Sequence, residues 1–138
     1  MNVLVAYDES APAQQAVKYA FETYPDSEII LLRVIEAADG YTDAGINLAR
    51  DALTERKEQA SEELLEEVKA LAGSEDVDFR TEVAVGKPAR EVVAYAEEHA
   101  VDHVIVGNHG REGVSRVLLG SVAERIVRRA PVPVTVVR

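Results

Sequence analysis

Short apolar runs alternate with longer amphipathic stretches along this chain, and that alternation limits its possible folds more than any other feature. Each run is rich in Val, Ile or Leu and has the length of a strand that is buried on both faces. The runs lie at residues 2–7, 28–35, 77–85, 104–106 and 132–137. Between them, apolar residues recur at helical spacing. Five strands that alternate with four helices predict a doubly wound, mostly parallel α/β sheet.

The first two helices have recognisable limits in the sequence. Ser10 is suited to cap a helix whose apolar face comprises Ala13, Ala16, Val17, Ala20 and Phe21. A second helix is expected from about residue 50 to residue 72, with Gly73 as the residue that follows its end. The polar stretch at 37–49 is too long for a tight connection, and we expect it to form a loop over one edge of a functional site.

The later elements are marked by proline and by one serine. Pro88 lies near the start of a third helix, and Ser121 with Glu124 fits a capping box at the start of a fourth. In a capping box the hydroxyl and the carboxylate each accept a hydrogen bond from a backbone N–H group. Pro131 and Pro133 favour an edge position for the final strand, because proline cannot donate a hydrogen bond to a neighbouring strand.

Two turns that contain glycine follow the fourth apolar run. Gly107 and Gly110 come directly after the run, and Gly120 precedes the helix that begins at Ser121. Glycine permits positive φ and the close approach of a ligand, and a helix N-terminus attracts anions. The two turns therefore predict a phosphate site at one strand end. Similar glycines and capped helices occur in α/β proteins without a ligand there, so the pattern alone leaves a purely structural role open.

A second line of reasoning leads to the same end of the sheet. Right-handed crossovers leave few topologies for such a chain, among them flavodoxin-like and Rossmann-like sheets. In these sheets ligands bind at the carboxyl ends of the strands, at the point where the strand order reverses. The first and fourth strands are the candidates for that point. Asp8 follows the first and Gly107 follows the fourth, so we expect both to border one site.

The composition excludes several classes of function. The chain has 138 residues and no linker or repeat, so we expect one domain over residues 1–138. The absence of cysteine excludes disulfides, a thiol nucleophile and a thiolate metal site. A formal net charge of −10 argues against a nucleic-acid partner and against an anionic membrane surface. Because the N-terminus has no signal-peptide pattern, we expect a cytoplasmic protein.

The acidity has a further pattern. The chain has 25 Asp and Glu residues against 15 Lys and Arg residues, and only four of the latter are Lys. This balance resembles that of proteins from salt-loving organisms, where concentrated salt screens the repulsion between like charges. An ordinary acidic protein is the alternative interpretation.

The spacing Gly107-x2-Gly110-x9-Gly120-Ser121 resembles the nucleotide-binding signature of the universal stress protein family, in its ATP-binding branch. The resemblance extends over essentially the whole chain and implies the fold of the adenine-nucleotide α-hydrolases. It also implies ATP, bound with Mg²⁺ or Mn²⁺ at the carboxyl ends of the first and fourth strands. The residues that it assigns to the nucleotide are Ala6, Asp8, Val34, Val106, Gly107, Asn108, Gly110, Arg111, Gly120, Ser121 and Val122.

The resemblance implies a role for each part of this set. The backbone at Val34 would recognise adenine, and Ala6 would line the adenosine pocket. Asp8 would lie near the ribose and phosphates and bind the divalent cation that the nucleotide carries. Gly120 and Ser121 would donate hydrogen bonds to phosphate oxygens.

The resemblance further implies a nucleotide-dependent switch in stress signalling. We expect at most slow hydrolysis, because the sequence offers no residue to orient the attacking water. Family members commonly dimerise through the last strand, which here contains Val132, Val134, Val136 and Val137. The alternative is a family member that binds no nucleotide and acts as a dimerising interaction module, although its glycine signature is typically degraded. An adenylyl-transferring enzyme would need room for a second substrate that a chain with short loops does not offer.

Other nucleotide-binding and catalytic motifs are absent from the sequence. No G-x-x-x-x-G-K-[ST] loop is present, and no G-x-G-x-x-G follows the first strand. A response-regulator receiver would need an aspartate and a lysine where this chain has Val85 and Val137. His109 has no nucleophile or third group to complete a triad, so we expect it to be a turn residue. His99 and His103 do not show the spacing of metal ligands.

Overall fold

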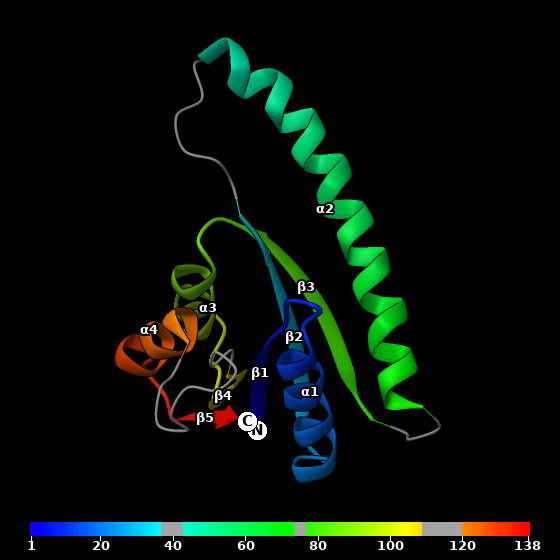
Figure 1. Ribbon diagram of the computed structural model, residues 1–138, viewed down its shortest axis with the longest axis vertical. Helices are drawn as coiled ribbons and strands as arrows, with labels where there is room; N and C mark the ends of the chain where they lie inside the picture. Colours follow the sequence, from blue (N-terminus) through cyan, green and yellow to red (C-terminus); the bar gives the residue numbers. More distant parts are fainter. Residues whose placement is uncertain (37–42, 74–76, 109–119) are drawn as a thin grey trace.

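Strands and helices alternate along the whole chain (Figure 1). The computed structural model describes residues 1–36, 43–73, 77–108 and 120–138, with the backbone alone for 43–53. The elements in chain order are β1 (Asn2–Ala6), α1 (Ala11–Thr23), β2 (Glu28–Ile35), α2 (Asp43–Ala72), β3 (Phe79–Val85), α3 (Pro88–Glu98), β4 (His103–Gly107), α4 (Ser121–Arg129) and β5 (Val134–Val137).

The five strands form one parallel sheet in the order β3-β2-β1-β4-β5. This confirms the five-stranded, doubly wound α/β sheet that the sequence predicts. The order is of the Rossmann type; in a flavodoxin-like sheet β3 would lie beside β1. β5 lies at an edge of the sheet, as the prolines before it predict. Proline has no N–H group to donate, and an edge strand needs donors for one neighbouring strand only. The order reverses between β1 and β4, and the carboxyl ends of these two strands therefore border the switch point.

Helices cover both faces of the sheet (Figure 1). Successive residues of a strand point to opposite faces, so β1 contributes Val3 and Val5 to one core and Leu4 to the other. α1 and α2 pack on the first face, and α3 and α4 pack on the second. Each fully buried Val, Leu or Ile side chain contributes about 1.5–3 kcal/mol of transfer free energy. In the part of the chain that the structure describes, no helix is long and apolar enough to cross a membrane.

α1 begins where the sequence predicts. The Ser10 hydroxyl accepts a hydrogen bond from the N–H group of Ala13 at 3.2 Å. All five residues of the predicted apolar face are buried, and Val17 is fully buried. Burial of this face brings the first turn of α1 against the carboxyl end of β4. The packing of α1 therefore shapes one wall of the switch point.

α2 is longer than the sequence analysis predicts. It begins at Asp43 rather than near residue 50, so residues 43–49 are helical and not part of a loop. The good helix formers of this stretch are Ala44, Leu48 and Ala49, and it contains no proline. Its single Gly45 costs about 1 kcal/mol, too little to end a helix. The helix ends as expected, because Gly73 takes a φ of 61° and its N–H group donates to the Lys69 carbonyl. The rest of the expected loop, 37–42, lies outside the described residues.

Candidate functional site

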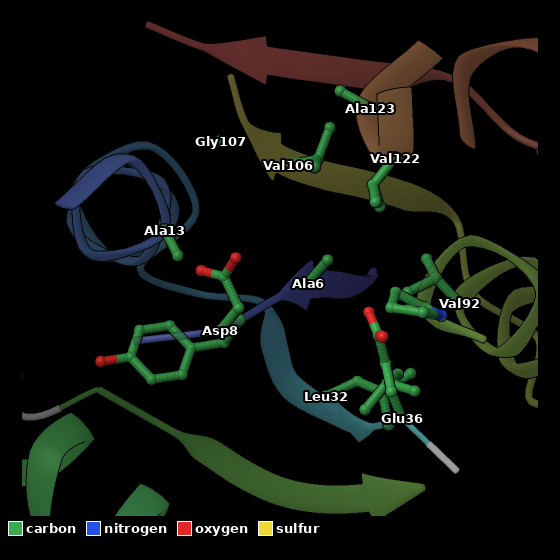
Figure 2. A pocket seen from close by; sticks show the side chains of 13 residues that line it. Ala6, Asp8, Ala13, Leu32, Glu36, Val92, Val106, Gly107, Val122 and Ala123 are labelled. Atoms are coloured by element: carbon green, nitrogen blue, oxygen red, sulfur yellow. The ribbon is translucent and has the colours of Figure 1, made fainter. Parts of the chain in front are cut away.

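A pocket opens at the carboxyl ends of β1, β2 and β4, beside the point where the strand order reverses (Figure 2). Its volume is about 180 Å³, and apolar side chains from the strand ends form most of its wall. The lining residues are Ala6, Tyr7 and Asp8 at β1, Leu32, Val34 and Glu36 at β2, Val106 and Gly107 at β4, Ala13 on α1, Pro88 and Val92 on α3, and Val122 and Ala123 on α4.

Asp8 is held by the turn that joins β1 to α1. Its carboxylate accepts hydrogen bonds from the backbone N–H of Ser10, at 3.1 Å, and from the Ser10 hydroxyl. The same hydroxyl accepts from the first turn of α1, so one serine both caps the helix and orients the aspartate. Figure 2 shows the carboxylates of Asp8 and Glu36 on either side of Ala6. These two groups give the apolar pocket a negative charge on each side.

Glu9 adopts an unusual backbone conformation in this turn. Its φ of 70° lies in the left-handed region, which costs a residue with a side chain about 1–2 kcal/mol. Glu9 Oε1 lies 2.7 Å from Arg33 Nη1, an ion pair rather than a well-aligned hydrogen bond. Arg33 belongs to β2, so the ion pair ties the β1–α1 turn to the neighbouring strand. This tie fixes the backbone directly after Asp8.

Tyr7 connects the pocket lining to helix α2. Its hydroxyl donates a hydrogen bond to Glu67 Oε2 on α2 at 2.8 Å. Burial raises the pKa of Tyr7 well above its ordinary value of 10.0, and the hydrogen bond to Glu67 adds to the effect. The phenol is therefore neutral and donates at physiological pH. This contact fixes the end of β1 against α2.

Gly107 allows β4 and α1 to approach more closely than any other residue would. A Cβ atom at this position would lie 2.5 Å from the carbonyl carbon and oxygen of Pro12 and 2.9 Å from the backbone nitrogen of Ala13. Backbone atoms cannot move aside as a flexible side chain can. Gly107 is thus required by close packing of the backbone at the pocket wall.

Asn108 and Gly120 bring together the two glycine-bearing turns that the sequence analysis identified. The N–H group of Gly120 donates a hydrogen bond to Asn108 Oδ1 at 2.9 Å. The N–H group of Asn108 donates to the carbonyl of Val137 at 2.8 Å, which extends the pairing of β4 with β5. Gly120, at the start of α4, therefore lies beside the end of β4. Gly110 and Arg111, with His109, lie outside the described residues.

The start of α4 differs from the predicted capping box. Gly120 is the N-cap residue, Ser121 is the first helical residue, and no side chain of the described residues caps the helix. Glu124 instead forms an ion pair with Arg128 at 2.8 Å, one turn along the same helix. The bond from Gly120 to Asn108 sets the helix start one residue earlier, so Ser121 lies within the helix and cannot cap it. The Ser121 hydroxyl is therefore not used as a cap.

The structure brings together most of the residues that the resemblance assigned to a nucleotide. Those that line the pocket are Ala6, Asp8, Val34, Val106, Gly107 and Val122. Asn108 and Gly120 adjoin it through their hydrogen bond, and Ser121 lines a neighbouring groove. The sequence analysis missed Glu36, although this residue follows the second strand as Asp8 follows the first. It also missed Pro88 and Val92, because nothing in the sequence indicates that α3 borders the site.

The described residues contain no group of three or more His, Asp or Glu side chains that could hold a metal ion. Among the described residues of the pocket lining, Asp8 and Glu36 are the two carboxylates. A hard cation such as Mg²⁺ takes oxygen ligands and commonly shares them between a carboxylate and the phosphates of a nucleotide. The pocket can therefore contribute part of a magnesium site, with the remaining ligands supplied by a bound molecule or by water.

Comparison with known proteins identifies the family. The family model described as "Universal stress protein family" matches residues 1–138. The chain belongs to the universal stress protein family. A universal stress protein of Methanocaldococcus jannaschii is 32% identical over 160 residues, which cover 99% of this chain and 94% of the relative.

Solved structures of universal stress proteins share the fold. The structure of UspA from Lactobacillus plantarum has a TM-score of 0.81 and 26% identity, and the match covers 100% of this universal stress protein and 97% of the other chain. A universal stress protein in complex with cAMP has a TM-score of 0.73, at 22% identity over 100% and 97% of the two chains. A family protein from Arabidopsis thaliana with AMP bound has a TM-score of 0.63, at 18% identity over 99% and 90%.

Proposed function

We propose that this universal stress protein binds ATP, together with Mg²⁺, in the pocket at the carboxyl ends of β1 and β4. The observation that carries the proposal is the position of the pocket, which lies at the reversal of strand order and is bounded by the N-terminus of α4. Ligands of open α/β sheets bind at that position. Structural neighbours with AMP and with cAMP support an adenine nucleotide as the ligand.

The apolar side of the pocket suits the adenosine part of the nucleotide. Ala6, Val34 and Val106 present aliphatic surface from three adjacent strand ends, against which a flat base can pack. We assign recognition of the adenine edge to the backbone at Val34. Glu36 lies two residues further along, and its carboxylate can accept a hydrogen bond from an amino or hydroxyl group of the ligand.

The β4–α4 side of the pocket suits the phosphates. The first N–H groups of α4, at Ser121 and Val122, have no acceptor within the helix and can donate to phosphate oxygens. We assign further phosphate and ribose contacts to Asn108, Gly110 and Arg111. Asp8 would bind Mg²⁺ between its carboxylate and the phosphates, which would also offset the repulsion between them. Mn²⁺ has the same preference for oxygen ligands and is the alternative cation.

We propose that nucleotide occupancy acts as a switch in stress signalling and that hydrolysis is slow at most. The two carboxylates of the described pocket lining already have roles with the cation and the base, and no histidine is among these residues. Water would therefore lack a group that orients it for attack. The bound and free states would differ in the turns around Asn108 and Gly120, and a partner protein would recognise one of them.

We propose a homodimer that forms through β5. This strand lies at the sheet edge and presents Val134, Val136 and Val137 together with unpaired backbone groups. Pairing with β5 of a second copy, with Val132 at the border, would cover this edge around a two-fold axis. Sedimentation equilibrium should give the mass of two chains, and Val136→Asp should give the mass of one. A monomeric wild-type protein would exclude this arrangement.

We also propose a single-domain cytoplasmic protein from a salt-loving organism. The formal net charge of −10 makes the folded chain repel itself at low salt. If the composition reflects adaptation to salt, the free energy of unfolding should rise steadily as KCl is increased from about 0.1 M to 1 M, where the screening length falls to about 3 Å. Stability that does not change over this range would favour an ordinary acidic protein.

The test of nucleotide binding is isothermal titration of Mg-ATP into protein freed of carried-over nucleotide, in concentrated KCl. We expect saturable binding by the wild type and its loss in a Gly120→Val, Ser121→Ala double variant. The valine side chain would shield the N-terminus of α4, and the alanine removes the hydroxyl. Ser27→Ala is the control, because it removes a hydroxyl far from the pocket at the start of β2.

The two outcomes separate two functions. Binding that is lost only in the double variant, with folding verified by circular dichroism, supports the nucleotide switch. A folded wild-type protein that binds no Mg-ATP would overturn the proposal. The leading function would then be that of a dimerising interaction module that works without nucleotide.

A further inference from the structure

A second cavity adjoins the strand-end pocket and lies between α3 and α4. Its volume is about 800 Å³. One wall comes from the start of α3, residues 86–90, and the other from α4, with Ser121, Arg125 and Arg129. Glu36, Pro88 and Val122 line both this cavity and the strand-end pocket. We refer to the second cavity as the α3–α4 groove.

Basic side chains gather in the α3–α4 groove although the chain as a whole is acidic. The lining contains Lys87 and Arg90 from α3 and Arg125 and Arg129 from α4, in a chain whose formal net charge is −10. All four are exposed, and none of them forms an ion pair with another residue that the structure describes. The groove is therefore a local region of positive charge with exposed donors.

Helix stability accounts for little of this arrangement. Lys87 is the N-cap residue of α3 and Arg90 lies in its first turn, where a positive charge opposes the helix dipole. Arg125 and Arg129 are four positions apart on α4, a spacing at which like charges repel. Arg128, on the same helix but outside the groove lining, is instead paired with Glu124. Lys87, Arg90 and Arg125 thus lie where the helices gain little or lose from a positive charge, whereas Arg129 alone has a favourable position in the last turn of α4.

The acidic groups near the groove do not neutralise it. Glu36 is the one carboxylate among the described residues that line the groove. The side chain of Glu91 lies against Gly86, at the end of the groove where α3 begins. Two carboxylates beside four cations leave the described part of the groove with a net positive charge.

We propose that the α3–α4 groove, which adjoins the strand-end pocket at Pro88 and Val122, is a second anion site and that it binds an oligophosphate group. Guanidinium groups bind phosphate oxygens through paired N–H donors, and Lys adds a point charge. Arg125 and Arg129 face the groove from successive turns of α4, while Lys87 and Arg90 approach from α3. Donors from two helices can therefore contact successive phosphate groups of one ligand.

The shared wall predicts that the two sites influence each other. Pro88 and Val122 separate the groove from the strand-end pocket, and each lines both. A ligand that shifts either residue changes the shape of both sites. Such coupling is reciprocal, so an anion in the groove and a ligand in the pocket must change each other's affinity by the same factor.

The test uses tripolyphosphate as the probe, titrated by calorimetry into nucleotide-free wild-type protein at one fixed KCl concentration. We expect saturable binding that is weakened at least about tenfold in the double variant Arg125→Gln, Arg129→Gln. Lys87→Gln, Arg90→Gln removes the two cations of the other wall and should weaken binding similarly. The control, Arg56→Gln, Arg128→Gln, removes two charges outside the groove and should change the affinity less than about twofold.

Each alternative result overturns the second anion site. The absence of saturable binding would do so, and so would equal losses in the groove and control variants, because net charge alone would then explain the effect. Strong binding that survives both groove variants would place tripolyphosphate elsewhere. A hexaglutamate peptide that binds where tripolyphosphate does not would indicate a protein partner. Tripolyphosphate binding by a protein that does not bind Mg-ATP would support the groove and refute the proposed nucleotide switch.

Discussion

The side chain of Asn108 accepts a hydrogen bond from the backbone N–H group of Gly120, over 2.9 Å. This contact joins the end of β4 to the start of α4, twelve residues apart in the sequence. It sets Gly120 as the N-cap residue and leaves Ser121 as the first residue of the helix. The N-terminus of α4 is thereby held beside the pocket rather than at a variable distance from it.

Replacement of Asn108 tests this contact. Asn108→Ala removes the acceptor, so the free energy of unfolding should fall by about 1 kcal/mol. If α4 then moves away from the pocket, the affinity for Mg-ATP should fall by about tenfold, which corresponds to about 1.4 kcal/mol. Chemical denaturation and calorimetric titration measure the two effects. Asn108→Asp retains an acceptor oxygen and should recover most of the stability, and failure to recover it would show that the amide nitrogen matters more.

Gly107 offers a test of close backbone packing. Gly107→Val places side-chain atoms against the backbone of Pro12, and we expect a loss of about 1–3 kcal/mol of stability from the forced displacement of α1. Gly73 is the matched control, because a Cβ there meets no atom of the described residues within 4 Å although φ is +61°. Gly73→Asn should cost less than about 1 kcal/mol, since asparagine tolerates left-handed backbone. Equal losses in urea denaturation would contradict the packing argument.

Ser10 links the stability of α1 to the position of Asp8. Ser10→Ala removes the helix cap and should lower the free energy of unfolding by about 1 kcal/mol. The substitution also removes the hydroxyl that donates to the Asp8 carboxylate. The affinity for Mg²⁺-bound nucleotide should therefore fall even when the variant is fully folded. Ser10→Thr retains the hydroxyl and should restore both properties. An unchanged affinity in Ser10→Ala would show that Asp8 does not need this donor.

His103 predicts a dependence of stability on pH. Burial lowers the pKa of His103 below its ordinary value of 6.5, and its Nε2 lies 2.6 Å from the Thr135 hydroxyl. Because the unfolded chain takes up this proton first, the stabilising contribution is complete above pH 6.5 and is lost as the pH falls towards the pKa of the folded protein. The slope for one proton is at most about 1.4 kcal/mol per pH unit.

The measurement compares urea denaturation of the wild type and His103→Gln at about pH 7.5 and pH 5.5, on either side of the ordinary pKa of histidine. The wild type should lose more stability on acidification than the variant, because both share every other titrating group. His99→Gln is the control for the loss of an exposed imidazole. Identical losses in the wild type and His103→Gln would contradict the assigned role of burial.

Local patterns determined much of this fold. The apolar runs became strands because residues buried on both faces must be apolar, and Ser10 caps α1 because its hydroxyl needs only the N–H group three residues away. The edge position of β5 also follows from local chemistry, since Pro133 has no N–H group for a neighbour. Each of these features depends on residues that are close together along the chain.

Other features depended on which segments meet in space. Glu36 and Pro88 border the pocket only because the end of β2 and the start of α3 lie beside the carboxyl end of β1 once the sheet and its helices are assembled. The start of α4 was mispredicted because an asparagine at the end of β4 binds Gly120 across the intervening chain. Likewise, Lys87 and Arg129 share a groove only through the packing of α3 on α4. The sequence by itself determined the elements and their buried faces, whereas tertiary packing decided the site, because side chains distant along the chain acquire common neighbours only when the sheet is assembled.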